Sequence, residues 1–429
     1  MNNNLSKDSL ATILMCSNLG MDIKNDTIKP FTIKQWNELS SKLINSEMKR
    51  PAAFFETNEQ EWKRYLMISD DEVMRIKKLL SRAGQIAIEL EYLNSTGIYV
   101  TTRAEENYPE RLKKVLKKNS PPVIFYCGNI DIAKSDGVAV VGSREIDEKA
   151  LDFTKTLVKK CIAQGFVVVS GGARGVDSAA QNAALLSEGK VISVIADSLL
   201  QRIKQKDVRE AIISGNLLLI SPFNPKTGFT VYNAMNRNKY IYALSKYAVA
   251  VSSDYDNGGT WAGAVENLKN KWVPLFVREE DGVPKGNRGL IDSGAIPLPT
   301  SELNDNNFNV KEFFELAEEK LKEKSYVPEQ YSVFSYIKEQ TEDDSRNEIE
   351  TCTPIEERAN KDSDFKKIDL FPIIWPYMEK VLKEARNKDE LSELLNISKA
   401  QLTIWLDRAI SENKVKKITR PVRYVLSNE

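Results

Sequence analysis

The sequence predicts an α/β protein whose doubly wound parallel sheet lies between an N-terminal helical domain and a C-terminal winged helix. Three observations support this class. Between residues 98 and 300, short apolar runs alternate with amphipathic segments, as strands and helices do around a parallel sheet. Residues 1–97 show mainly helical periodicity. Residues 366–429 predict a helix, a turn, a second helix and two short strands.

The clearest strand–helix–strand unit lies at residues 138–169. Residues 138–141 are short and valine-rich, as expected of a strand that is buried on both faces. A helix is predicted over residues 147–164 and ends at Gly165, and residues 166–169 form the next strand. This order predicts a Rossmann-like sheet, in which ligands bind beyond the carboxyl ends of the strands.

Two glycine-containing turns fall at that edge of the predicted sheet. Gly142-Ser143-Arg144 follows the first strand, and the run from Ser170 to Asp177, which contains Arg174, follows the second. Backbone N–H groups in such turns approach oxyanions closely, and arginine adds charge-assisted hydrogen bonds. Either turn alone is equally consistent with glycines that only shape the backbone. Two arginine-bearing turns at one edge favour a phosphate site.

The same edge continues further along the chain. A long polar loop is predicted over residues 221–235, and Asn236-Arg237-Asn238-Lys239 opens the helix that follows it. Asn257-Gly258-Gly259-Thr260 forms a third turn of small residues between a strand and a helix. The candidate DNA- or phosphate-binding residues are Gly142, Ser143, Arg144, Ser170, Gly171, Gly172, Arg174, Gly175, Lys226, Arg237, Asn238, Lys239, Asn257, Gly258, Gly259 and Thr260.

Composition excludes several kinds of catalysis. The chain has no histidine, which removes histidine bases, histidine-containing triads and histidine-ligated metals. Its 4 cysteines are scattered, and the P-loop pattern is absent. We therefore expect no cofactor, no metal and no catalytic residues. With a formal net charge of +0, attraction to nucleic acid must come from local patches. The absence of a long apolar run or a signal-like N-terminus predicts a cytoplasmic protein without membrane contact.

The motifs resemble those of the DprA family (DNA-processing protein A, also called Smf). The family patterns GSR, SGxARGxD and RNR correspond to residues 142–144, 170–177 and 237–239, and residues 286–295 resemble its GxNxLIxxGA ending. The resemblance implies binding of single-stranded DNA, self-association into a dimer, and loading of a RecA-type recombinase onto DNA taken up by the cell. The sequence departs from the family at Gln181, at Lys239 and at Ala234-Met235, where an aromatic–proline pair usually precedes RNR.

We divide the chain into four parts. Residues 1–97 form the helical domain, with a helix that follows Asp70-Asp71 as a candidate N-cap. Residues 98–300 form the DprA-type domain. Residues 301–365 form an acidic helix and linker, with residues 339–364 strongly solvated. Residues 366–429 form the winged helix, whose basic residues fit binding of duplex DNA and of protein equally well.

The leading hypothesis is a non-enzymatic recombination mediator that holds single-stranded DNA in a basic phosphate groove. Two alternatives stay open. One is an antitoxin or phage-defence component with a cognate toxin as its partner, because DprA-like proteins also resemble antitoxins. The other is a nucleotide-binding phosphohydrolase that holds phosphate at Gly258-Gly259-Thr260 and uses Glu266 or Asp177 as acid or base.

Overall fold

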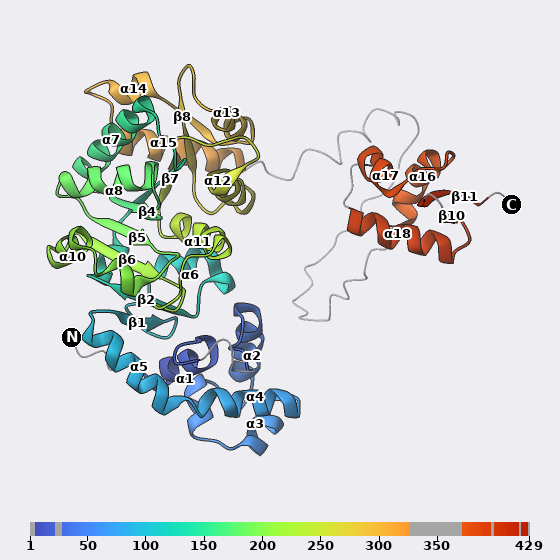
Figure 1. Ribbon diagram of the computed structural model, residues 1–429, viewed down its shortest axis with the longest axis horizontal. Helices are drawn as coiled ribbons and strands as arrows, with labels where there is room; N and C mark the ends of the chain where they lie inside the picture. Colours follow the sequence, from blue (N-terminus) through green and yellow to red (C-terminus); the bar gives the residue numbers. More distant parts are fainter. Residues whose placement is uncertain (1–4, 22–27, 326–370, 396–398, 420–421, 428–429) are drawn as a thin grey trace, which may run out of the picture. The chain divides into compact units, whose positions relative to one another are not determined.

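A computed structural model describes residues 5–21, 28–325, 371–395, 399–419 and 422–427 (Figure 1). The chain divides into two compact units, Met1–Ser335 and Tyr336–Glu429, which are described separately. The segment 339–364, predicted to be a linker, lies outside the described residues. None of the described helices is both long and apolar enough to cross a membrane.

The first unit is organised around a nine-stranded sheet with the order β1-β2-β6-β5-β4-β3-β7-β8-β9. From β6 to β9 all neighbours are parallel, whereas β1 and β2 pair with each other antiparallel and β2 joins β6 antiparallel. The strands are β1 (Tyr99–Thr102), β2 (Val123–Cys127), β3 (Gly137–Val141), β4 (Val167–Ser170), β5 (Val191–Val194), β6 (Leu217–Ser221), β7 (Tyr247–Ala250), β8 (Leu275–Glu279) and β9 (Ile296–Pro299). The predicted parallel α/β sheet is therefore confirmed from β6 to β9, whereas the antiparallel pairing of β1 and β2 was not predicted.

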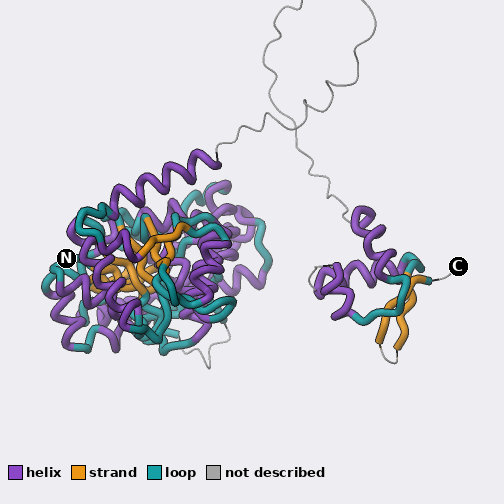
Figure 2. Tube along the Cα trace, turned by 90° about the horizontal axis from the view of Figure 1, so that it is seen from above, coloured by secondary structure: helices purple, strands orange, loops and turns teal. Residues whose placement is uncertain are grey.

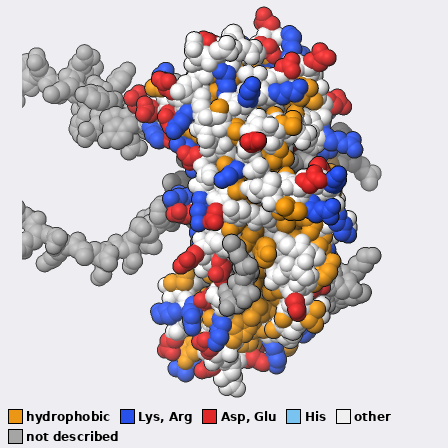
Figure 3. Space-filling view, turned by 90° about the vertical axis from the view of Figure 1, so that its left-hand side faces the viewer, with side chains coloured by type: hydrophobic (Ala, Val, Ile, Leu, Met, Phe, Trp, Pro, Cys, Tyr) orange, Lys and Arg blue, Asp and Glu red, His pale blue; other side chains and the backbone are white. Residues whose placement is uncertain are grey.

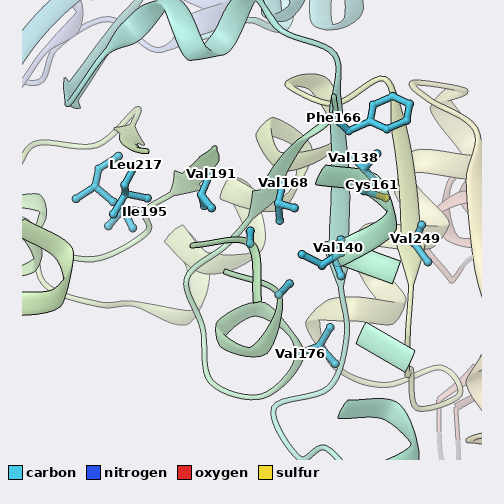
Figure 4. Packing of buried hydrophobic residues seen from close by; sticks show 14 of the residues in the cluster. Val138, Val140, Cys161, Phe166, Val168, Val176, Val191, Ile195, Leu217 and Val249 are labelled. Atoms are coloured by element: carbon cyan, nitrogen blue, oxygen red, sulfur yellow. The ribbon is translucent and has the colours of Figure 1, made fainter. Parts of the chain in front are cut away.

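Alternating side chains of each strand enter two different cores. Val138 and Val140 of β3 pack on one face with α7 (Glu148–Ala163) and α8 (Val176–Leu186), as Figure 4 shows. Ala139 and Val141 pack on the other face with α11 (Val231–Ala243) and α12 (Gly258–Asn270). The first face also carries α9 (Leu199–Arg202), α10 (Lys206–Ile213), α14 (Thr300–Asn304) and α15 (Val310–Ser325); the second carries α6 (Glu110–Leu116), the 3₁₀ turn η3 (Ile130–Lys134) and α13 (Lys285–Asp292). A short 3₁₀ turn, η2 (Lys117–Asn119), follows α6.

The N-terminal helices have a core of their own. They are α1 (Lys7–Cys16), α2 (Ile33–Asn45), η1 (Pro51–Phe55), α3 (Glu59–Leu66), α4 (Asp70–Leu80) and α5 (Ala83–Ser95). Trp36, Phe54 and Trp62 are buried among them, while Leu14 and Ile86 join the core of the sheet. The N-cap of α4 is Ser69, whose side chain forms a capping box with Glu72, so Asp70 and Asp71 lie in the first turn instead of capping it.

The second unit contains α16 (Phe371–Val381), α17 (Lys388–Leu395), α18 (Lys399–Ser411), β10 (Val415–Thr419) and β11 (Val422–Leu426). The two strands pair antiparallel, and Phe371, Leu391 and Leu406 belong to one buried cluster. Figure 2 shows the helices and the hairpin of this unit by type. From α17 onward the described elements have the predicted order, whereas α16 was not predicted and the predicted turn at 396–398 lies outside the described residues. The assignment as a winged helix stays a prediction.

One predicted boundary was wrong. The loop expected to reach Met235 ends at Thr230, because the Thr230 side chain accepts a hydrogen bond from the Asn233 N–H and caps α11 there. Asn236 to Lys239 therefore lie inside α11 instead of opening it. Arg237 is buried in this helix, and its Nη1 donates to the Val194 carbonyl at the carboxyl end of β5.

Candidate nucleic-acid interface

A cavity of about 490 Å³ lies at the carboxyl ends of β3 and β7. The chain runs outward from β3 toward β6 and then returns to β7 on the other side of β3, so this is the point where the strand order reverses. Three segments form most of the lining: the turn after β3, the first half of α11, and the stretch from Ser253 to Thr260. In sheets of this kind, that crevice is the expected ligand site.

The turns after β3 and β4 interlock. A β-carbon on Gly142 would collide with Val176 at the start of α8, and one on Gly175 would collide with the carbonyl oxygen of Ser143. The Val176 N–H donates to that same carbonyl at 3.2 Å, and the Ser143 N–H donates to the Ser252 carbonyl at 3.0 Å. The two glycines are therefore needed for close backbone contact between the turns.

Asp177 holds the second turn from inside. Its carboxylate accepts the N–H groups of Gly171 at 3.1 Å and Ala173 at 3.4 Å. Burial raises the pKa of Asp177, while the nearby Arg237 guanidinium and the two backbone N–H groups oppose that rise. The carboxylate is 7 % exposed and serves the loop, so its role is structural.

Arg237 is the buried counter-charge of Asp177. Its guanidinium lies against Gly171, and its Nη1 donates to the Val194 carbonyl at 2.7 Å. Burial lowers the pKa of Arg237, and Asp177 counteracts this most strongly among the neighbouring charges. Its Nε–H is buried and has no partner in the structure. Arg237 therefore forms part of the cavity floor and is not a surface phosphate ligand.

The N-terminus of α12 forms the opposite side of the cavity. Asn257 is the N-cap, yet its side chain makes no capping hydrogen bond. Gly258 follows with a φ of 80°, and Asn238 Nδ2 donates to the Gly259 carbonyl at 3.0 Å, which ties α11 to α12. The N–H groups of an uncapped first turn need an external acceptor.

The structure brings nine of the sixteen predicted residues into the cavity lining. They are Gly142, Ser143, Arg144, Arg237, Asn238, Asn257, Gly258, Gly259 and Thr260. Ser170, Gly171, Gly172 and Gly175 belong to the turn beneath and beside it and are not in the lining.

Three predicted cations do not join this cavity. Lys226 forms an ion pair with Glu89 of α5 at 2.7 Å, and its ammonium lies 5.5 Å from the centre of the Tyr92 ring. Lys239 lines a second cavity of about 240 Å³ together with Glu266, and burial lowers its pKa. Arg174 is exposed and lines neither cavity. Arg144, Arg174 and Lys239 thus do not share a single cavity.

The charge of the lining is mixed. Arg144 and Arg237 stand beside three carboxylates, those of Glu145, Asp177 and Asp254. One outer face of the first unit likewise shows basic and acidic side chains interspersed (Figure 3). Attraction of an anion to the cavity therefore depends on backbone N–H groups and on the exposed Arg144, and not on a uniformly basic surface.

One exposed aromatic side chain, Phe229, belongs to the cavity lining and is 53 % exposed. Two others are exposed outside it: Tyr232, which lines the second cavity, is 76 % exposed, and Tyr255, next to the lining residue Asp254 in the chain, is 62 % exposed. The Arg144 guanidinium carbon lies 5.8 Å from the centre of the Phe229 ring, and the Tyr255 ring packs 4.9 Å from that of Trp261. Tyr255 was missed from the sequence, although an aromatic residue just after a buried strand and before a glycine turn was a usable signal.

The two carboxylates considered as alternative acids or bases for hydrolysis, Asp177 and Glu266, lie in different surroundings. Asp177 is occupied by the loop N–H groups, and Glu266 lines the second cavity, away from the turn at Gly258. Among the described residues, no group of three or more acidic or cysteine side chains is arranged to hold a metal ion.

Together, the mostly parallel sheet, the reversal point in its strand order and the glycine turns at its carboxyl edge define a doubly wound α/β protein. Residues 99–305 match the family described as DNA recombination-mediator protein A. The DNA processing protein DprA of Streptococcus pneumoniae is 29% identical over 195 residues, which is 44% of this chain and 67% of the relative. Residues 99–305 of this chain therefore form a DprA/Smf-type domain.

Two solved structures are similar. The X-ray structure of DprA from Streptococcus pneumoniae has 22% identity and a TM-score of 0.47, and the match covers 65% of this chain and 98% of that one. A structure of DNA processing protein A from Helicobacter pylori, which describes that protein's binding mode for single-stranded DNA, has 24% identity and a TM-score of 0.42. It covers 52% of this chain and 98% of the other.

Proposed function

We propose that this protein binds single-stranded DNA at the carboxyl edge of its sheet and acts in DNA processing as a recombination mediator. One observation carries the proposal: at the mouth of the cavity, exposed Arg144 and exposed Phe229 lie together above the uncapped start of α12. This places a cation, an aromatic face and backbone N–H donors within one site. A nucleotide in a strand offers the complementary phosphate and base.

The exposed rings favour a single strand over a duplex. Bases stack on aromatic side chains when they are free of a partner strand, whereas a duplex presents its phosphates and keeps its base faces stacked internally. Phe229 of the cavity lining and Tyr232 of the second cavity are each more than half exposed. Because the lining has few free cations, we expect a modest salt dependence, with a slope of about −0.7 for each phosphate neutralised.

The remaining parts of the proposal follow from the DprA/Smf-type domain. They are loading of a RecA-type recombinase, assembly as a dimer, and a cytoplasmic location. The mediator role requires no chemical step, which agrees with the structural engagement of Asp177. The second unit supplies exposed Lys416, Lys417 and Arg423 on its hairpin, which would suit contact with DNA phosphates if the winged-helix assignment is correct.

The test is binding of a fluorescent oligonucleotide, single- and double-stranded, across a salt series. We compare the wild type with Arg144→Ala, with Lys239→Ala and with the double variant. The matched control is Lys159→Ala, which removes one exposed cation from α7 on the opposite face of the sheet. We expect a preference for the single strand, at least a tenfold loss in the Arg144 variants, and no loss in the control.

The Lys239 variant separates the two cavities. A loss only with Arg144→Ala places the strand in the larger cavity, whereas comparable losses with each variant place it across both. Weak binding that ignores salt and all substitutions refutes the proposal. The search then turns to a toxin-like protein partner, by co-purification with the full chain.

A further inference from the structure

The larger cavity offers more groups that can bind an anion than an internal phosphate of a DNA strand would contact. The first turn of α12 belongs to a 13-residue helix and has no side-chain cap, in contrast to α7 and α11, which are capped by Asp147 and Thr230. A β-carbon on Gly258 would meet no heavy atom within 4 Å. There is thus free space beside the first residue of α12, and no side chain caps the N–H groups of this turn.

Arg237 provides an independent sign of a missing ligand. Its side chain is 6 % exposed and lines the cavity, and its buried Nε–H has no partner. Leaving a buried charged donor unsatisfied is costly, and such groups normally indicate a water, an ion or a ligand. A phosphodiester held at the mouth by exposed Arg144 would not satisfy a donor on the floor.

The walls of the cavity suit a base. Val231, Ile241 and Tyr242 of α11 contribute apolar surface, and Asn238 and Ser253 contribute hydrogen-bonding groups. The volume of about 490 Å³ lies within the range of about 300–1,000 Å³ that is usual for small-molecule sites. A whole nucleotide can therefore enter, with its base on the apolar wall.

From these features we infer that the cavity binds a nucleotide bearing a phosphate monoester, either a free nucleotide or the phosphorylated end of a DNA strand. The inference rests on the proposed function, because it specifies which part of a strand enters the cavity. A terminal phosphate carries more charge and more free oxygens than an internal diester. It can accept hydrogen bonds from the α12 turn while its additional charge is attracted to the guanidinium of Arg237 in the floor.

The experiment uses the full chain and one thymidine oligonucleotide in four forms: phosphorylated at the 5′ end, phosphorylated at the 3′ end, unphosphorylated, and closed into a circle. Free thymidine monophosphate and thymidine are added as competitors. We expect one phosphorylated end to bind at least tenfold more tightly than the unphosphorylated strand, and thymidine monophosphate but not thymidine to compete for it.

The key variant is Gly259→Asp, which places a carboxylate at the second residue of α12. Its β-carbon would lie no closer than 3.7 Å to Asn238 and Met235, so the fold tolerates it. The control is Gly84→Asp, the same change at the second residue of α5, where nothing lies within 4 Å. We expect Gly259→Asp to abolish the preference for a phosphorylated end and Gly84→Asp to keep it.

The outcomes separate this inference from the proposed function. Equal binding of all four DNA forms, with thymidine monophosphate no better than thymidine, overturns the inference and leaves single-strand binding intact. If thymidine monophosphate binds but no DNA strand does, the inference is supported and the site is assigned to free nucleotides. The same result refutes the proposed function. Tighter binding of a phosphorylated strand than of thymidine monophosphate assigns the site to strand ends. Binding of no probe overturns both.

Discussion

Gly171 lies directly beneath the guanidinium of Arg237, and a β-carbon there would occupy the space of Nη1. The same Nη1 donates to the Val194 carbonyl, so the guanidinium cannot withdraw without losing its buried hydrogen bond. Gly171 and Arg237 therefore depend on each other for their packing, although 66 positions separate them in the chain.

We expect Gly171→Ala to destabilise the protein by about 1–3 kcal/mol, the usual cost of overpacking a filled interior. Urea unfolding of the wild type and the variant measures this directly. Gly84→Ala is the matched control, because its β-carbon meets nothing within 4 Å and the change favours a helix. An unchanged free energy of unfolding in Gly171→Ala would show that Arg237 moves aside freely.

Lys226 should matter for stability more than for DNA binding. Its ion pair with Glu89 joins the segment before α11 to α5, and the lysine side chain is 49 % exposed. We expect Lys226→Met to lower the free energy of unfolding by at most about 1 kcal/mol, since exposed pairs contribute little. Affinity for single-stranded DNA should stay within twofold, compared with a large loss in Arg144→Ala. A large loss of affinity for single-stranded DNA at an unchanged free energy of unfolding would show that Lys226 contacts DNA.

Phe229 should act as a stacking platform. Alanine substitution of a stacked aromatic residue costs about 1–3 kcal/mol per base, which corresponds to about 5- to 150-fold in affinity. We expect Phe229→Ala to weaken binding of the single strand within this range and Phe229→Tyr to keep it. Leu186→Ala is the control, because Leu186 is an 87 % exposed apolar residue of α8, away from the cavity lining. Equal affinities for the Phe229 variants would exclude stacking at this ring.

The stability of the protein should depend on pH through ionisation of Glu105. Burial is the largest influence on its pKa and would raise it, but hydrogen bonds from the side chains of Ser9 and Ser6 and from the Ser6 N–H outweigh burial and lower it. A carboxyl with a lowered folded-state pKa stabilises the fold fully above its unfolded value of about 4.3 and loses that contribution as the pH falls.

The test for Glu105 compares thermal unfolding midpoints between pH 7 and pH 3. We expect Glu105→Gln to be less stable than the wild type at pH 7, with the difference shrinking as the pH falls below about 4.3. Glu106→Gln, at the exposed neighbouring position, should follow the wild type at every pH. If the unfolding midpoints of Glu105→Gln and the wild type differed by the same amount at every pH, ionisation of Glu105 would not contribute to the pH dependence of stability.

Most strands of the sheet were predicted because they carry a local signal, whereas β9, which contains two prolines, was missed. Valine-rich runs such as residues 138–141 and 167–169 are buried on both faces, and Gly165 marks the end of α7. These patterns are local, so they can be recognised without knowing which segments pack together in the fold. The same holds for the turns at Gly142 and Gly258, which were identified correctly as parts of one edge.

The cations were harder to place because their roles depend on distant partners. Nothing near Arg237 in the sequence reveals that Asp177 and Val194 will enclose it, and nothing near Lys226 reveals Glu89. The start of α11 was misplaced for a local reason, since Thr230 was a usable N-cap signal that the polar composition of the loop obscured. Charge type alone therefore overestimates how many basic residues face a ligand.

The interlocking of the turns after β3 and β4 has a kinetic consequence. Gly142 is held against Val176, and Gly175 is held against Ser143. Neither turn therefore has room to rearrange when a DNA strand binds. The binding groups are preorganised, so little of the interaction energy is lost in ordering the backbone. Association should then be limited by diffusion and orientation, and differences in affinity among variants should appear mainly as differences in how long the strand remains bound.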